Sequence, residues 1–119
     1  MNTPVPPREE ETAFGGLDLL SSAVILLDEQ LRIRHCNPAA ENLFAVSQRV
    51  CQGRPLAQLL GTPAALVSAL ENALANQWSY TGHDIVIARE NSGPIHVDCT
   101  VTPIETAHAR LLLEFRPID

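Results

Sequence analysis

The chain has 119 residues, 45% of them hydrophobic and 18% charged, and it carries a formal net charge of −6. This length fits one domain and is too short for a sensor and a catalytic domain together. All eight basic residues are scattered arginines, so the basic stripe that nucleic-acid binding needs is missing, and no apolar run approaches the roughly 20 residues of a membrane-spanning helix. We therefore expect neither a nucleic-acid partner nor a membrane partner.

The N-terminal residues and the cysteines indicate a cytoplasmic location. Residues 1–8 contain three prolines and lack the basic start and apolar middle of a signal peptide. Cys36, Cys51 and Cys99 form an odd set without C-x-x-C spacing, which fits reduced thiols better than a disulfide framework. We interpret them as thiols of the core or the surface.

The first 20 residues divide into an arm and a short apolar segment. Residues 1–13 combine three prolines with three consecutive glutamates, which predicts a flexible arm, followed by one domain over residues 14–119. Phe14, Leu17 and Leu20 then recur at helical spacing in a segment too short to be stable alone. Two alternatives are open for this segment: packing on its own domain, or a dimer contact.

Residues 23–44 are predicted to form two strands and a helix. An apolar run at residues 23–27 is followed by a turn, and residues 31–35 alternate between apolar and polar side chains as a half-buried strand does. Asn37 is placed to cap the helix through its side-chain oxygen, and Pro38 suits the first helical position.

The middle of the chain is predicted to be helical. Residues 47–53 are predicted to form a loop, and residues 55–60 a short helical piece. Thr62 is placed to cap the longest helix, with Pro63 at its first position and an end near Asn76 or Gln77. The apolar stripe of this helix consists of Leu66, Val67, Leu70 and Leu74.

Three strands are predicted in the remainder. Residues 85–88 lead through a turn into residues 95–102, where apolar and polar side chains alternate. The last strand, at residues 110–116, places three apolar side chains on one face. Leu112 interrupts the opposite, polar face, which indicates a contact there.

Side chains with catalytic or metal-binding potential are few. His96 and Asp98 share one face of a predicted strand, but no third ligand and no nucleophile accompany them, so a solvated face is favoured over a metal site. The sequence also lacks a G-x-S-x-G elbow, a glycine-rich phosphate loop and an H-E-x-x-H zinc helix. We expect no catalysis from this chain.

The order of these elements resembles a PAS domain, in which the second strand enters a helix through an Asn-x-x-Ala-Glu-x-Leu-Phe motif. The residues that match this motif are Asn37, Ala40, Glu41 and Phe44. Residues 31–41, 53–56 and 111–119 further resemble the amino-terminal PAS domain of the NtrB family of nitrogen-regulation sensor histidine kinases. The likeness extends from about residue 14 to the end.

The resemblance implies an α+β fold: a five-stranded antiparallel sheet in the order 2-1-5-4-3, with short helices on one face. It implies the sensory and dimerisation domain of a cytoplasmic two-component histidine kinase, whose catalytic parts lie beyond Asp119. The partners implied for the full-length kinase are a PII-type signalling protein and a response regulator. No cofactor is implied, because residues 46–60 lack the flavin motif and residues 62–77 contain no haem-binding histidine.

Two functions follow as hypotheses. The first is a homodimeric interaction module, with Phe14, Leu17, Leu20 and Leu112 as candidate interface residues. The alternative is a small-ligand sensor of another signalling protein, with specificity from an apolar cavity carrying a few polar groups. Its candidate pocket contacts are Asn37, Tyr80 and Cys99.

Overall fold

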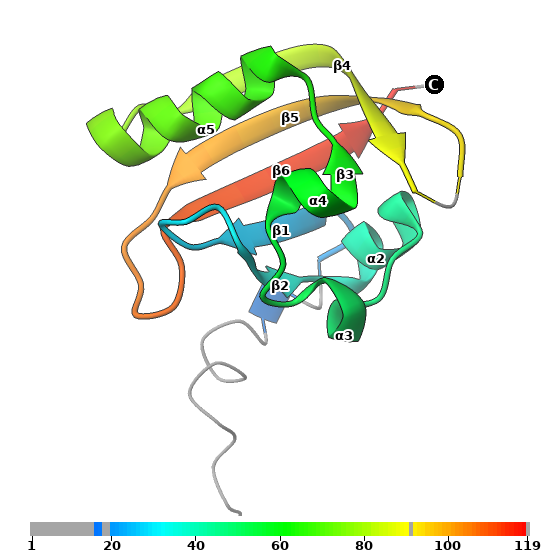
Figure 1. Ribbon diagram of the computed structural model, residues 1–119, viewed down its shortest axis with the longest axis horizontal. Helices are drawn as coiled ribbons and strands as arrows, with labels where there is room; N and C mark the ends of the chain where they lie inside the picture. Colours follow the sequence, from blue (N-terminus) through cyan, green and yellow to red (C-terminus); the bar gives the residue numbers. More distant parts are fainter. Residues whose placement is uncertain (1–15, 18–19, 91, 119) are drawn as a thin grey trace, which may run out of the picture.

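A curved antiparallel sheet forms one layer of the molecule, and the helices form the second layer on one of its faces (Figure 1). The computed structural model describes residues 16–17, 20–90 and 92–118. The strands are β1 (Ala23–Leu27), β2 (Ile33–Cys36), β3 (Leu60–Gly61), β4 (Tyr80–Arg89), β5 (Ile95–Pro103) and β6 (Leu111–Pro117). The helices are α2 (Pro38–Phe44), α3 (Gln48–Cys51), α4 (Leu56–Leu59) and α5 (Ala64–Asn76).

The strand order β2-β1-β6-β5-β4-β3 places the first strand beside the last. β1 pairs with both β2 and β6, so that Ile25 lies opposite Cys36 on one side and Leu113 on the other. All five residues of β1 are buried. Burial on both faces explains why this strand is an unbroken apolar run and shows no alternation.

The expected number of five strands is wrong, because the described residues contain a sixth. β3 has two residues, pairs with Ala88 and Arg89 at the end of β4, and extends the expected order by one edge strand. A Cβ atom on Gly61 would lie 2.7 Å from the Cβ of Ala88, so this close pairing requires glycine. A strand of two residues is too short to show an alternating pattern, and residues 55–60 were expected to be helical throughout.

The capping predictions had mixed outcomes. The Asn37 side chain accepts a hydrogen bond from the Ala40 amide, which confirms the predicted cap of α2. The predicted loop at residues 47–53 is wrong, because it contains α3, whose cap is the Ser47 side chain. The predicted Thr62 cap is also wrong: Pro63 holds the cap position of α5, without a side-chain hydrogen bond.

The main hydrophobic core lies between the helices and the inner face of the sheet. Phe44 of α2 meets Phe115 of β6 edge to face, with ring centroids 4.9 Å apart. α5 contacts β4, β5 and β6, and its fully or nearly buried residues are Leu66, Ala69, Leu70 and Ala73. This stripe follows the expected helical spacing, with Val67 and Leu74 half buried at its side.

Candidate functional site

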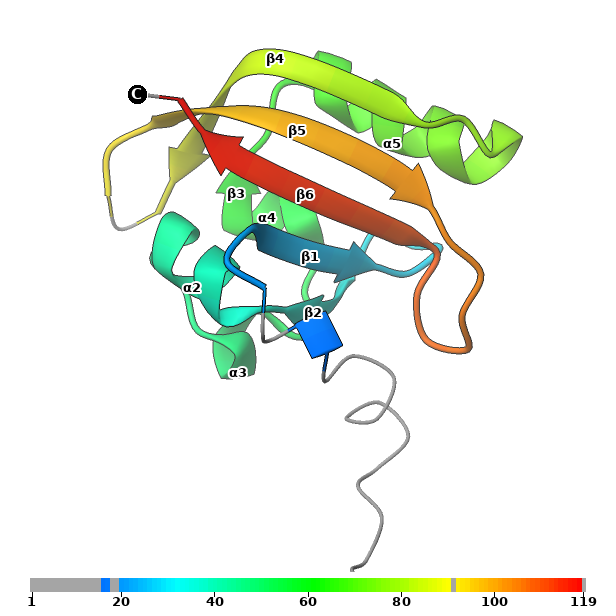
Figure 2. The same cartoon turned by 180° about the vertical axis from the view of Figure 1, so that it is seen from behind.

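The outer face of the sheet is the face that the helices leave open (Figure 2). Successive side chains of a strand point to opposite faces, so two residues of β1 point outward from the main core. There they form a second apolar group, here called the outer cluster. Its buried members are Val24, Leu26 and Ala109, and its half-buried members are Leu17, Ile104 and Leu112.

Two of the predicted interface residues meet in the outer cluster. Leu17 and Leu112 both pack against its buried members, although they lie far apart in the sequence. Leu20 is 48% exposed, and Phe14 lies outside the described residues. Leu17 therefore packs on its own domain, while the half-buried members of the cluster and Leu20 keep part of their surface exposed.

The far end of the outer face mixes apolar and polar side chains. Val86 of β4 is 46% exposed and pairs with His96 of β5. Ile118 is 42% exposed, and its amide donates a hydrogen bond to the His96 carbonyl. These single apolar residues are separated from the outer cluster by charged and hydroxyl side chains of β5 and β6.

His96 and Asp98 do share a face, as predicted, but each pairs with a residue from an irregularity in β4. His96 Nδ1 lies 2.6 Å from Asp84 Oδ1, and His83 Nδ1 lies 3.5 Å from Asp98 Oδ1. Asp84 has a positive φ of 52°, where the pairing register shifts between Gly82 and Ile85. In the part of the chain that the structure describes, no group of three histidine, cysteine or acidic side chains could hold a metal ion.

Asn37 is the one polar residue among the fully buried residues described. Its side-chain oxygen accepts hydrogen bonds from the amides of Val24 and Ala40, at 2.9 and 3.0 Å. Its side-chain nitrogen donates to the carbonyls of Ser22 and Leu17, at 2.8 and 3.1 Å. The carboxamide thus joins the N-terminal segment, β1 and α2, and its hydrogen-bonding capacity is used within the chain.

The other two candidate pocket residues lie elsewhere in the fold. Tyr80 is half buried at the start of β4 and lines a groove of about 210 Å³ beside α5 and Trp78. Cys99 is buried in the middle of β5, and this burial raises the pKa of its thiol to about 12. Contact of these residues with a ligand stays a prediction.

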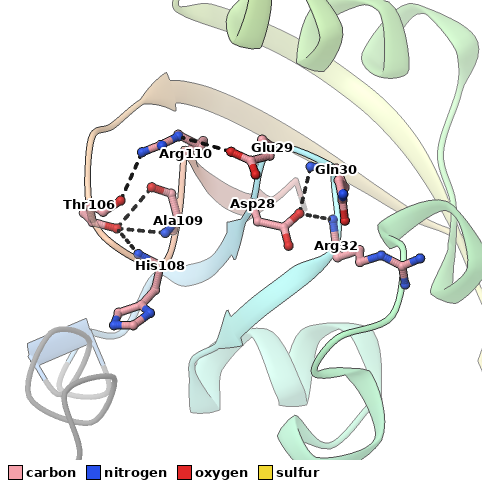
Figure 3. A network of polar contacts seen from close by, with 8 residues as sticks. All are labelled: Asp28, Glu29, Gln30, Arg32, Thr106, His108, Ala109 and Arg110. Atoms are coloured by element: carbon pink, nitrogen blue, oxygen red, sulfur yellow. Dashed lines mark hydrogen bonds and ion pairs between the residues drawn. The ribbon is translucent and has the colours of Figure 1, made fainter.

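A polar network joins the β1–β2 turn to the β5–β6 loop (Figure 3). Asp28 holds the turn, because its side chain accepts hydrogen bonds from the amides of Gln30 and Arg32 at 2.9 and 3.0 Å. The Arg110 guanidinium reaches from the loop to Glu29, with Nε 3.7 Å from the carboxylate. Both ends of this ion pair are largely exposed, so it fixes the loop only weakly.

Thr106 organises the β5–β6 loop from within. Its hydroxyl oxygen accepts from the amides of His108 and Ala109, and its carbonyl accepts from Arg110 Nη1. Together the turn and the loop line a cleft of about 310 Å³. Its mixed charges suit a polar partner group, and its main residues are Asp28, Glu29, Arg34, Thr106, His108 and Arg110.

The sequence predictions did not include this cleft. The Thr106 hydroxyl bonds to amides two and three residues ahead, which is a local pattern of threonine in turns and could have marked the loop. The contact between the turn and the loop follows from the pairing of β1 with β6, which no local pattern indicates and which only the strand order implied by the PAS resemblance anticipated.

A family model described as the PAS fold matches residues 15–118 of the chain. Among curated proteins, the sensory histidine kinase/phosphatase NtrB of Vibrio alginolyticus is 33% identical over 104 residues, and NtrB of Klebsiella oxytoca is 28% identical over 103 residues. Each alignment covers 87% of this chain and 29% of the relative. The chain thus spans less than a third of the length of these relatives.

Solved structures agree with these matches. The PAS domain of nitrogen regulation protein NR(II) from Vibrio parahaemolyticus is 29% identical, with a TM-score of 0.73 over 95% of this chain and 100% of that one. The PAS domain of the fruit-fly ELK potassium channel has a TM-score of 0.72 at 16% identity, covering 94% of this chain and 98% of that one. The second likeness concerns the fold alone.

Proposed function

The chain belongs to the PAS family, and we propose that it is the signal-input and dimerisation domain of a two-component sensor histidine kinase of the nitrogen-regulation type. The similarity to NtrB covers most of this chain, and the similarity to the NR(II) domain covers all of that domain. NtrB is named a sensory histidine kinase/phosphatase, and NR(II) is named a nitrogen regulation protein. The sequence identity of this chain to both relatives supports a nitrogen-regulation kinase over a PAS module of another signalling class.

The single observation that supports dimerisation is the outer cluster. It is apolar, it lies on the face without helices, and its members Leu17, Ile104 and Leu112 are only half buried. Burial of such a half-covered surface against a second copy removes apolar area from water. Leu20 follows Leu17 by three residues and adds an exposed side chain to the proposed interface.

We propose that the remaining functions reside in the longer protein. Kinase activity, a response regulator as its substrate and a PII-type regulatory partner are inferred from the NtrB relatives, which are longer than this chain. We also propose a cytoplasmic location, a flexible arm at residues 1–13 and one sensor domain at residues 14–119. Among the described residues, no helix combines the length and apolar character needed to cross a bilayer.

Sedimentation equilibrium tests the dimer. Leu112→Glu places a charge in the outer cluster, and we expect the dimer dissociation constant to rise at least about tenfold. Asn72→Glu adds the same charge to the exposed side of α5, far from this face, and should leave the dissociation constant unchanged. Circular dichroism of both variants checks the fold.

Two results would overturn the proposal. In the first, the unaltered chain stays monomeric at all concentrations up to roughly several hundred micromolar, a range in which even a weak dimer would form. The other is equal dimerisation of Leu112→Glu and Asn72→Glu, which would place the interface away from the outer cluster.

A further inference from the structure

Two of the three cysteines lie together where β2 and α3 end. Cys36 is the last residue of β2 and Cys51 the last residue of α3, and their side chains are 2% and 0% exposed. The Cys36 amide donates to Gln48 Oε1 at 2.7 Å, and the Cys51 thiol donates to the Gln48 carbonyl at 3.7 Å. Both cysteines are therefore anchored around Gln48, the first residue of α3.

A second set of backbone contacts fixes the segment after α3 against β2. The Gly53 amide donates to the Ile33 carbonyl at 2.6 Å, and the Ile33 amide donates to the Arg54 carbonyl at 2.9 Å. These bonds hold the residues that follow Cys51 against the strand that ends at Cys36.

The side chains of Cys36 and Cys51 share a hydrogen bond. The side chain of Cys36 lowers the pKa of the Cys51 thiol below its ordinary value, against burial and the Glu41 carboxylate, which raise it. The Arg54 guanidinium also lowers the pKa of Cys51. A thiol stabilised as thiolate beside a second thiol is the arrangement from which disulfides form.

We propose that Cys36 and Cys51 form an oxidation site, at which a peroxide converts the two thiols into an intramolecular disulfide. The Cys51 thiolate attacks one peroxide oxygen, the O–O bond breaks, and the product is a sulfenic acid and hydroxide. The Cys36 thiol then attacks the sulfenic sulfur, the S–S bond forms and the S–O bond breaks. Two electrons pass from the sulfur atoms to hydrogen peroxide, and the released protons and oxygens leave as two waters.

The oxidant reaches the buried pair by local opening of α3. This helix has only four residues, too few to be stable without its cap and tertiary contacts. Arg49, Val50 and Gln52 around Cys51 are exposed, so Cys51 is the only buried residue of a one-turn surface helix. Short surface elements of this kind open at a lower free-energy cost than the core strands.

Cys99 provides an internal control in the same chain. It lies in a central strand, and burial raises the pKa of its thiol to about 12, so it stays a protonated and poorly reactive thiol. The geometry thus assigns the oxidation to two of the three cysteines.

Mass spectrometry of the full 119-residue chain tests the site. Treatment with hydrogen peroxide should lower the intact mass by about 2 Da, and a thiol reductant should restore it. Trypsin cleaves after arginine except before proline, so it separates the three cysteines into peptides 35–49, 50–89 and 90–110. Without reductant we expect peptides 35–49 and 50–89 to be joined, and peptide 90–110 to carry a free thiol.

Variants separate a specific site from general oxidation. Cys36→Ala and Cys51→Ala should each abolish the 2 Da loss and the joined peptides, whereas Cys99→Ala should leave both unchanged. The proposal fails if the chain gains oxygen without cross-linking, or if peptide 90–110 appears in the cross-link. Because the decisive peptides come from the unaltered chain, a variant that does not fold cannot conceal a negative result.

Discussion

The inner and outer faces of the sheet differ most clearly within β6, where successive side chains point to opposite faces. Leu111, Leu113 and Phe115 point inward and are at most 1% exposed, whereas Leu112 and Glu114 point outward and are half buried. The inner side chains meet the helix layer, whereas Leu112 packs in the outer cluster and Glu114 lies 3.8 Å from Arg116 Nη1. The inner face of β6 therefore belongs to the main core, and its outer face is the more exposed of the two.

Truncation of Leu113 and of Leu112 should lower the free energy of unfolding by different amounts. Leu113→Ala leaves a cavity in the main core, and we expect it to lower the free energy of unfolding by about 2–5 kcal/mol. Leu112→Ala removes the same atoms from a half-buried position and should cost less than about 1 kcal/mol. Chemical denaturation of both variants measures the difference. Similar losses would mean that the outer face is as much a core as the inner one.

Asn37 connects the two faces, and its removal should have the next largest effect. Asn37→Ala leaves two buried amides and two carbonyls without their partner, and we expect a loss of about 2–4 kcal/mol. Asn42→Ala on the exposed side of α2 is the matched control and should change the stability by less than about 0.5 kcal/mol. Equal losses in the two variants would refute the connecting role of Asn37.

Cys99 makes the inner face sensitive to alkaline pH. Below the ordinary thiol pKa both the folded and unfolded chains keep this proton, so Cys99 adds no pH dependence there. Between that value and about 12 the unfolded chain loses the proton while the folded chain keeps it, and stability falls by up to about 1.4 kcal/mol per pH unit. Unfolding measured from pH 8 to pH 11 under reducing conditions should show a shallower decline for Cys99→Ala, and parallel curves would contradict the assignment.

The smallest expected effect concerns the helix layer that covers the inner face. Gln77 ends α5 with a positive φ of 59°, a conformation that glycine adopts without strain. Gln77→Gly should raise the free energy of unfolding by about 0.5–1 kcal/mol. Gln77→Ala keeps the strain and is the control. A glycine variant no more stable than the alanine variant would show that this helix end is not strained.

Local patterns were sufficient to predict most strands and helices, whereas the strand order was implied by the resemblance to PAS domains. The apolar run of β1, the alternation of β5 and the Asn37 cap are each properties of a few consecutive residues. β3 was missed because its two residues are defined by pairing with Arg89 and Ala88, far along the chain. The start of α5 was misplaced by one residue because proline, and not the threonine before it, holds the cap position.

The candidate site was less predictable because it depends on contacts between distant segments. The sequence singled out Leu17 and Leu112 separately, but only the pairing of β1 with β6 brings them to one cluster. The contact between Cys36 and Cys51 joins a strand to a helix that was expected to be a loop. Side-chain chemistry was therefore visible in the sequence, while most of the contacts that combine these side chains in space are not recorded in local patterns.

The position of β1 between β2 and β6 has a consequence for synthesis on the ribosome. β1 is made early, but one of its two hydrogen-bonded neighbours is the last strand to emerge. Until then its run of five apolar residues has an unpaired edge, which is a hazard for self-association of nascent chains. We expect translation stalled before residue 111 to yield chains that bind chaperones, and chains released after residue 117 to escape them.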